Sequence, residues 1–201
     1  MTPNRLADLE RSAWRSNFDD GLFDLLLGSM LLLNWLGSVV PNNRLLYPFF
    51  FAIVGAYVVV KRVVVLPRTG VARFAAPRRQ RKVLSMALLL APLLLGLAVM
   101  VLTSLDGTSA AWLRAHPIVF HAAFPLMVVL VFSGLASLLE VPRIHAIGVI
   151  MALAFGVDLW RDSATGFLIG GVLVCIPGIV LLTRFLHRYP PLTPEERQHA
   201  R

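Results

Sequence analysis

Residues 115–139 read AHPIVFHAAFPLMVVLVFSGLASLL, and this run contains no Asp, Glu, Lys or Arg. An α-helix needs about 20 apolar residues to cross the hydrocarbon core of a bilayer, so this stretch is long enough to span a membrane. The other long uncharged stretches are 25–43, 45–60, 83–105, 144–157 and 163–183. None alternates polar and apolar residues as a barrel strand would, so we expect helices, which pair their own backbone groups within the lipid.

The composition of the whole chain also indicates a membrane protein. Of the 201 residues, 57% are hydrophobic and 15% are charged, and the mean hydropathy is +0.74. Soluble domains are about 45–50% apolar and about 25% charged. The net charge of +8 is then explained by basic residues that anchor loops, and we expect no nucleic-acid partner. The single cysteine, Cys175, permits no disulfide within the chain.

These stretches predict an all-α, polytopic transmembrane bundle of six spans with both termini in the cytoplasm. The expected spans are about 21–40, 45–65, 83–104, 116–139, 143–160 and 165–186. The positive-inside rule favours six, because the outer loops then hold only Arg44, Arg114 and Arg161. Five spans would place the C-terminal arginines outside as well.

The fifth predicted span needs a separate argument. Its uncharged stretch, 144–157, has only 14 residues. It becomes long enough to cross if Arg143 and Asp158 lie at the two membrane interfaces.

Around the spans we expect three further segments. Residues 1–20 form an interfacial, amphipathic N-terminal segment with no signal-peptide pattern. The six-helix domain covers 21–186, its basic cytoplasmic loop is 65–82, and 187–201 form a cytoplasmic tail.

Ionisable side chains near the membrane are the default candidates for function. The candidates are Asp20, Asp24, Lys61, Arg62, His121, Asp158 and Arg161. Asp20 and Asp24 share a helical face, and Asp24 is expected to pair with Lys61 or Arg62. Asp158 and Arg161 are three residues apart on a helix and are expected to pair with each other.

Histidines and aspartates on the predicted outer side, His121 and Asp158 among them, are suitable in type for a metal ion or a proton relay. The chain lacks the His-x₃-His spacing of a helical metal site, so interfacial ion pairing is the preferred interpretation. No nucleotide loop, cysteine pair or nucleophile motif is present either. We therefore predict no metal, no cofactor and no enzymatic activity.

The predicted loop 65–82 contains six basic residues and no acidic residue. They are Arg68, Arg73, Arg78, Arg79, Arg81 and Lys82. Such a segment is suited to anionic lipid headgroups. The alternative is a plain topological anchor.

Small residues recur at four-residue spacing in the last predicted hairpin. They are Gly148, Ala152 and Gly156, followed by Gly166 and Gly170. Small residues at this spacing let helix backbones approach closely. We expect tight packing of the fifth and sixth spans, or a dimer face.

Two short motifs resemble small, uncharacterised bacterial multispan membrane proteins. The first is Asp20-Gly21-Leu22-Phe23-Asp24 followed by Gly28, and the second is Pro67-Arg68-Thr69-Gly70-Val71 followed by Phe74. Those proteins tend to show Asp-Gly-x-x-Asp-x-x-x-Gly at the first span and Pro-Arg-x-Gly-Tyr-Val-x-Phe after the second. Here Val71 directly follows Gly70, so the tyrosine is absent. The resemblance implies a bacterial inner-membrane location and brings no activity.

Two classes of function follow. The favoured one is a binding or regulatory membrane component, whose partners are membrane lipids and either a second copy or another membrane protein. The alternative is a small oligomeric transporter or channel, for which six spans and the helix prolines Pro92, Pro125 and Pro177 are the support.

Overall fold

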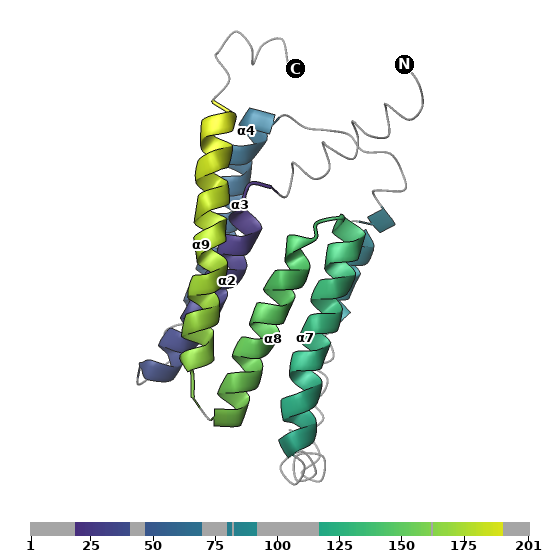
Figure 1. Cartoon of the computed structure of the whole chain (residues 1–201). Coiled ribbons are helices and arrows are strands. Elements are labelled where there is room, and N and C mark those ends of the chain that lie inside the picture. Colours follow the sequence, from purple (N-terminus) through teal and green to yellow (C-terminus); the bar gives the residue numbers. More distant parts are fainter. Residues whose placement is uncertain are drawn as a thin grey trace. The chain divides into compact units, whose positions relative to one another are not determined.

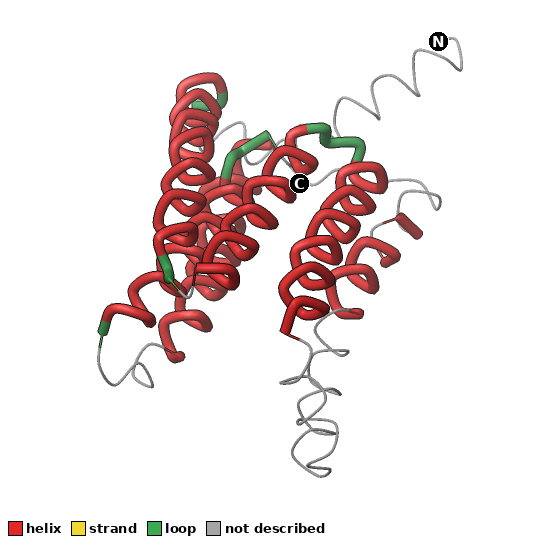
Figure 2. Tube along the Cα trace, turned by 60° about the horizontal axis from the view of Figure 1, so that its bottom comes forward, coloured by secondary structure: helices red, strands yellow, loops and turns green. Residues whose placement is uncertain are grey.

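The computed structural model describes residues 19–40, 47–69, 80–81, 83–91, 117–161 and 163–190. Within these ranges the chain forms helices joined by turns and contains no strand (Figure 2). The predicted all-α class is confirmed. The predicted interfacial segment 1–20, apart from its last two residues, and the tail from 191 onward lie outside the described residues.

The elements follow one another as shown in Figure 1. They are α2 (Leu22–Val39), α3 (Tyr47–Val60), the π-helical turn η2 (Lys61–Val65), α4 (Leu66–Thr69), α7 (Pro117–Leu139), α8 (Arg143–Arg161) and α9 (Thr165–Arg188). The predicted bounds of the first, fourth, fifth and sixth spans agree with α2, α7, α8 and α9 to within two residues.

Five of the described helices are long and apolar enough to cross a membrane. They are Leu22–Val39, Pro48–Arg68, His121–Leu139, Arg143–Arg161 and Thr165–Arg188. The fifth predicted span is among them, with Arg143 and Arg161 at its two ends. Of the third predicted span, 83–104, only residues 83–91 are described, and they are helical. A sixth span therefore stays a prediction.

The second helix differs from the sequence prediction at its end. It was expected to stop near residue 65, but α3 continues through η2 into α4 and ends at Thr69. Within η2 the Leu66 N–H donates to the Lys61 carbonyl, five residues back. A π-helical turn inserts one extra residue into a helix and is frequent at functional sites.

The chain divides into two compact units, and the first comprises residues up to Phe74 and from Leu168 onward. Its buried cluster joins three helix ends, because Leu22 begins α2, Val65 ends η2 and Phe185 is near the end of α9. The start of α2, the end of η2 and the end of α9 therefore lie on one side of this unit. Val65 is 0% exposed, so the three ends are tightly packed.

Glycines bring α2 and α9 into close contact within this unit. A methyl group at Gly28 would lie 2.5 Å from the Cys175 Sγ and 3.0 Å from the Gly171 carbonyl oxygen. Gly21 has a φ of 71° and leaves no room for a side chain beside the Gly178 carbonyl. Backbones can approach this closely only where side chains are absent.

The second unit, Ala75–Phe167, contains the antiparallel pair α7 and α8, which lie side by side in Figures 1 and 2. The two helices are joined by a turn at Glu140, whose φ is 59°. Phe155 of α8 makes edge-to-face contacts with Phe124 of α7 and with Phe167, each at a centroid distance of 4.9 Å. Such aromatic pairs add to the packing of this unit.

The small residues of α8 pack against α7. A methyl group at Gly148 would collide with the Phe132 side chain, and one at Gly156 would lie 3.7 Å from Pro125. Both contacted residues belong to α7, whereas the sequence predicted the sixth span as their partner. Ala152, between them on α8, is buried. Gly166 fits against Ala154 and Asp158, so it does pack on α8, and Gly170 is buried.

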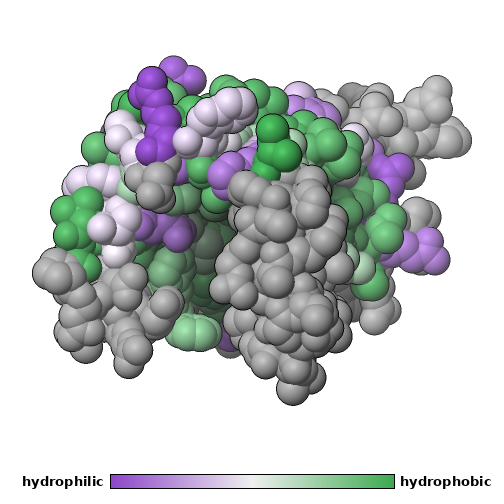
Figure 3. All heavy atoms as spheres, turned by 90° about the horizontal axis from the view of Figure 1, so that it is seen from below, coloured by the Kyte–Doolittle hydropathy of each residue, from purple (hydrophilic) through white to green (hydrophobic). Residues whose placement is uncertain are grey.

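Large apolar side chains are exposed along most described helices, and apolar residues reach the surface seen in Figure 3. Phe51 of α3 is 79% exposed, Leu130 of α7 is 63% exposed and Leu153 of α8 is 64% exposed. Soluble monomers rarely leave large contiguous apolar surfaces in water. On helices of spanning length, such side chains are solvated by lipid.

Candidate functional site

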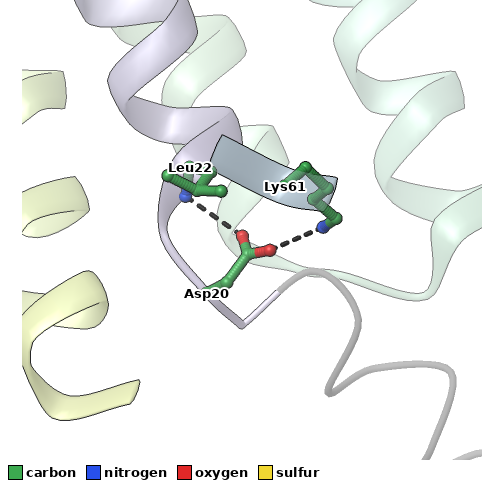
Figure 4. Close-up of polar contacts among 3 residues, drawn as sticks. All are labelled: Asp20, Leu22 and Lys61. Carbon is green, nitrogen blue, oxygen red and sulfur yellow. Dashed lines mark hydrogen bonds and ion pairs between the residues drawn. The ribbon is translucent and has the colours of Figure 1, made fainter. Parts of the chain in front are cut away.

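A polar contact joins the turn before α2 to η2 (Figure 4). The Asp20 carboxylate is 0% exposed, and its Oδ1 accepts a hydrogen bond of 3.0 Å from the Leu22 N–H. An aspartate can bond the backbone two residues ahead in this way, which satisfies a donor at the start of the helix. The left-handed Gly21 between the two makes this tight turn possible.

The second oxygen of Asp20 binds Lys61. The Lys61 Nζ donates to Oδ2 at a distance of 2.5 Å, and the two side chains are 17% and 1% exposed. Lys61 is the first residue of η2, so one carboxylate holds both the start of the first span and the π-helical turn of the second. Because both groups are shielded from water, removing either partner leaves a poorly solvated charge.

Asp24 lies in the first turn of α2 and is 1% exposed. The described ion pair of Lys61 is with Asp20, which lies in the turn before α2, so the two aspartates do not share the predicted helical face. Arg62, the other predicted partner of Asp24, has an exposed side chain. A methyl group at Gly178 would lie 3.2 Å from the Asp24 Cβ, so this carboxylate-bearing turn is packed directly on α9.

Two of the predicted lipid-binding arginines make contacts within the protein. Arg68 of α4 donates to the carbonyl oxygens of Leu186, at 3.3 Å, and Tyr189, at 3.0 Å, at the end of α9. A cation is favourable there because the last carbonyls of a helix lack backbone partners and carry a partial negative charge. Arg81 forms an ion pair with Glu140. The other predicted contacts lie outside the described residues; they are Arg73, Arg78, Arg79 and Lys82.

Asp158 binds the start of α9. Its Oδ1 accepts from the Gly166 N–H at 2.6 Å and its Oδ2 accepts from the Phe167 N–H at 2.7 Å. Ser163 Oγ lies 3.4 Å from Oδ1. The carboxylate is buried and serves as a helix cap from the preceding element. The expected Asp158–Arg161 pairing is wrong as the main role of this carboxylate, since its two oxygens face backbone donors and Arg161 is exposed.

His121, the remaining predicted candidate, is half-buried on α7 and lines a groove between α7 and α8. Arg161 lines the same groove, whereas Asp158 is not part of its lining. Among the described residues, no group of three His, Cys, Asp or Glu side chains is placed to hold a metal ion. The predicted candidates therefore lie at three separate places. Asp20 and Asp158 make contacts at helix ends, and His121 lines a groove.

Comparison with protein-family models, curated proteins and solved structures finds no match to the chain. Its class therefore follows from its own geometry: helices of spanning length, lipid-facing apolar side chains and charged groups gathered at helix ends. The protein is a helical membrane protein with several candidate spans.

Proposed function

We propose that this protein is a non-catalytic binding component of the bacterial inner membrane, with six spans and both termini in the cytoplasm. The observation that carries the proposal is how the buried polar side chains are used. Asp20 joins α2 to η2, and Asp158 caps α9. Arg68, which is half-buried, closes the end of α9. Groups committed to holding helix ends favour a fixed scaffold over a reaction centre.

We infer a sixth crossing from the apolar stretch between Thr69 and Pro117. Residues 83–104 are long and apolar enough to cross a bilayer. Together with the five candidate spans among the described helices, this crossing would give the chain an even number of spans.

Residues 81–91 contact the second unit at the end of α7. Arg81 pairs with Glu140 in the turn between α7 and α8, and a methyl group at Gly134 would meet Leu88. These contacts support a third span that begins beside the end of α7.

In this topology the basic segment 65–82 lies in the cytoplasm and carries the binding surface. Arg68 and Arg81 hold this segment against the rest of the protein, because both side chains contact other elements. We propose that its remaining basic residues bind an acidic cytoplasmic face of a membrane-protein partner.

A co-purification experiment tests the proposal. The protein is extracted in mild detergent, and stoichiometric companions are identified by mass spectrometry. A variant with Arg73, Arg78, Arg79 and Lys82 changed to Gln is expected to lose the companion. The matched control changes Arg184, Arg188, Arg197 and Arg201 to Gln and is expected to keep it. A chain that purifies without any companion, or a companion held equally by both variants, contradicts the proposal.

The alternative of a small oligomeric transporter or channel has one observation in its favour. Asp20 and Asp24 are buried carboxylates at the start of a spanning helix, and ionisable groups in such positions often serve transport. Proton or cation flux into liposomes containing the purified protein, abolished in Asp24→Asn, would establish this function instead. An absence of flux in wild-type liposomes would eliminate it.

A further inference from the structure

A groove of about 530 Å³ lies between α7 and α8, within the second unit. This volume is in the range of ~300–1,000 Å³ that is usual for small-molecule sites. Along most of its length the groove is apolar, with Leu126 and Val129 from α7 and Val149 and Leu153 from α8. Leu126 and Leu153 are 59% and 64% exposed, so the groove opens on the lipid-facing surface.

The groove exists because small residues lie where the two helices face each other. Ala122 of α7 and both Ala152 and Gly156 of α8 are part of its lining. The wall beside Gly156 is Pro125, at 3.7 Å from the position of a methyl group. Larger side chains at these positions would fill the space between the helices.

The polar groups of the groove are confined to one end. They are His121 near the start of α7 and Arg161 at the end of α8, beside Trp160. A second depression of about 240 Å³ lies at this end and is lined by His121, Trp160, Ile118 and Ala122. Trp160 is 80% exposed, as suits an indole at the headgroup level of a bilayer.

Arg161 gives this end a positive charge. The nearest acidic residue on its helix, Asp158, directs both carboxylate oxygens to the backbone of residues 166 and 167. Among the residues that the structure describes, the lining of the groove and of the depression contains no acidic side chain. The site therefore combines a long apolar groove with a basic residue, Arg161, at the end that carries the exposed Trp160.

We propose that the groove binds one acyl chain of an anionic phospholipid, with the lipid phosphate against Arg161. The occupant enters sideways from the bilayer, because the open edge of the groove is formed by lipid-facing residues. The charge at Arg161 selects anionic over zwitterionic headgroups, and the small faces of Ala152 and Gly156 accommodate the chain. This site does not depend on the basic segment 65–82 or on the proposed protein partner.

Native mass spectrometry tests the assignment. The full-length protein is reconstituted in nanodiscs that contain equal amounts of phosphatidylglycerol and phosphatidylcholine with the same acyl chains, and is then released in mild detergent. We expect one retained phosphatidylglycerol per chain. In Arg161→Gln the preference for phosphatidylglycerol is expected to fall about fivefold. In Val157→Trp, which narrows the groove, retention of both lipids is expected to fall.

Matched variants control for general effects of charge and bulk. Arg62→Gln removes an exposed arginine outside the groove, and Leu130→Trp adds an indole to an exposed position of α7 outside the lining. Both are expected to retain phosphatidylglycerol as the wild type does. Equal retention of the two lipids by the wild type, or an unchanged preference in Arg161→Gln, overturns the proposal. Arg161 is exposed, so Arg161→Gln remains informative even if Val157→Trp does not fold.

Discussion

The ammonium group of Lys61 lies 2.5 Å from Oδ2 of Asp20, and this contact ties the entry of the first span to the π-helical turn within the second. The same carboxylate accepts a backbone hydrogen bond from Leu22. Asp20 is thus both an ion-pair partner and a helix cap, and its two roles can be separated by substitution.

Lys61→Met is expected to destabilise the protein by about 3 kcal/mol, because a buried carboxylate then loses its cation. Combining it with Asp20→Asn removes the stranded charge and is expected to recover part of that loss. The measurement is thermal unfolding of the purified protein in detergent. Arg62→Met is the matched control, since Arg62 is the neighbouring and exposed cation. If the two single variants unfold alike, the buried ion pair does not stabilise the fold.

The cap on α9 gives a second prediction. Asp158→Ala removes the acceptor of two backbone N–H groups and is expected to cost about 1–3 kcal/mol. Asp158→Asn keeps one acceptor oxygen, so its stability is expected to lie between those of the wild type and Asp158→Ala. Arg161→Gln, assayed after lipid extraction, should leave the stability nearly unchanged. A larger loss in Arg161→Gln than in Asp158→Ala would restore the simple ion-pair interpretation of these residues.

The close approach of α2 and α9 gives a third prediction. Gly28→Ala places a methyl group 2.5 Å from the Cys175 Sγ and is expected to cost about 1–3 kcal/mol through overpacking. The control is Gly55→Ala on α3, where no other part of the described chain lies within 4 Å of the new methyl group. Alanine has a higher helix propensity than glycine, so the free energy of unfolding is expected to rise by about 0.5–1 kcal/mol in Gly55→Ala. Similar stability changes in both variants would show that α2 and α9 are not in contact at Gly28.

Helix existence and bounds were predictable from the sequence because lipid solvation demands long uncharged stretches. Even the fifth span, with its 14 uncharged residues, was recovered by allowing charged residues at its ends. The extension of the second helix to Thr69 was not predicted. It depends on a π-helical turn and on Arg68 binding the end of α9, and neither leaves a local pattern in the sequence.

The partners of the candidate polar residues were only partly predictable from the sequence. Asp20, Lys61 and Asp158 were named from the sequence, but the spacing rules that paired Asp158 with Arg161 consider only side chains on one helix. The actual partners of Asp158 are backbone groups eight and nine residues ahead, brought close by the turn before α9. The small residues gave a similar result: Gly166 of the last span packs on α8 as expected, whereas Gly148 and Gly156 of α8 face α7. A small-residue face shows that a helix packs closely, but not against which neighbour.

The most direct test of the account is the side of the membrane on which the chain ends. Reporter fusions are placed after residue 190 and, in truncated chains, between Asp106 and Ser109. Six spans predict a fluorescent protein that is folded in the cytoplasm at the first site and an active periplasmic phosphatase at the second. Phosphatase activity at the C-terminal fusion would contradict the proposed topology of six spans with both termini in the cytoplasm.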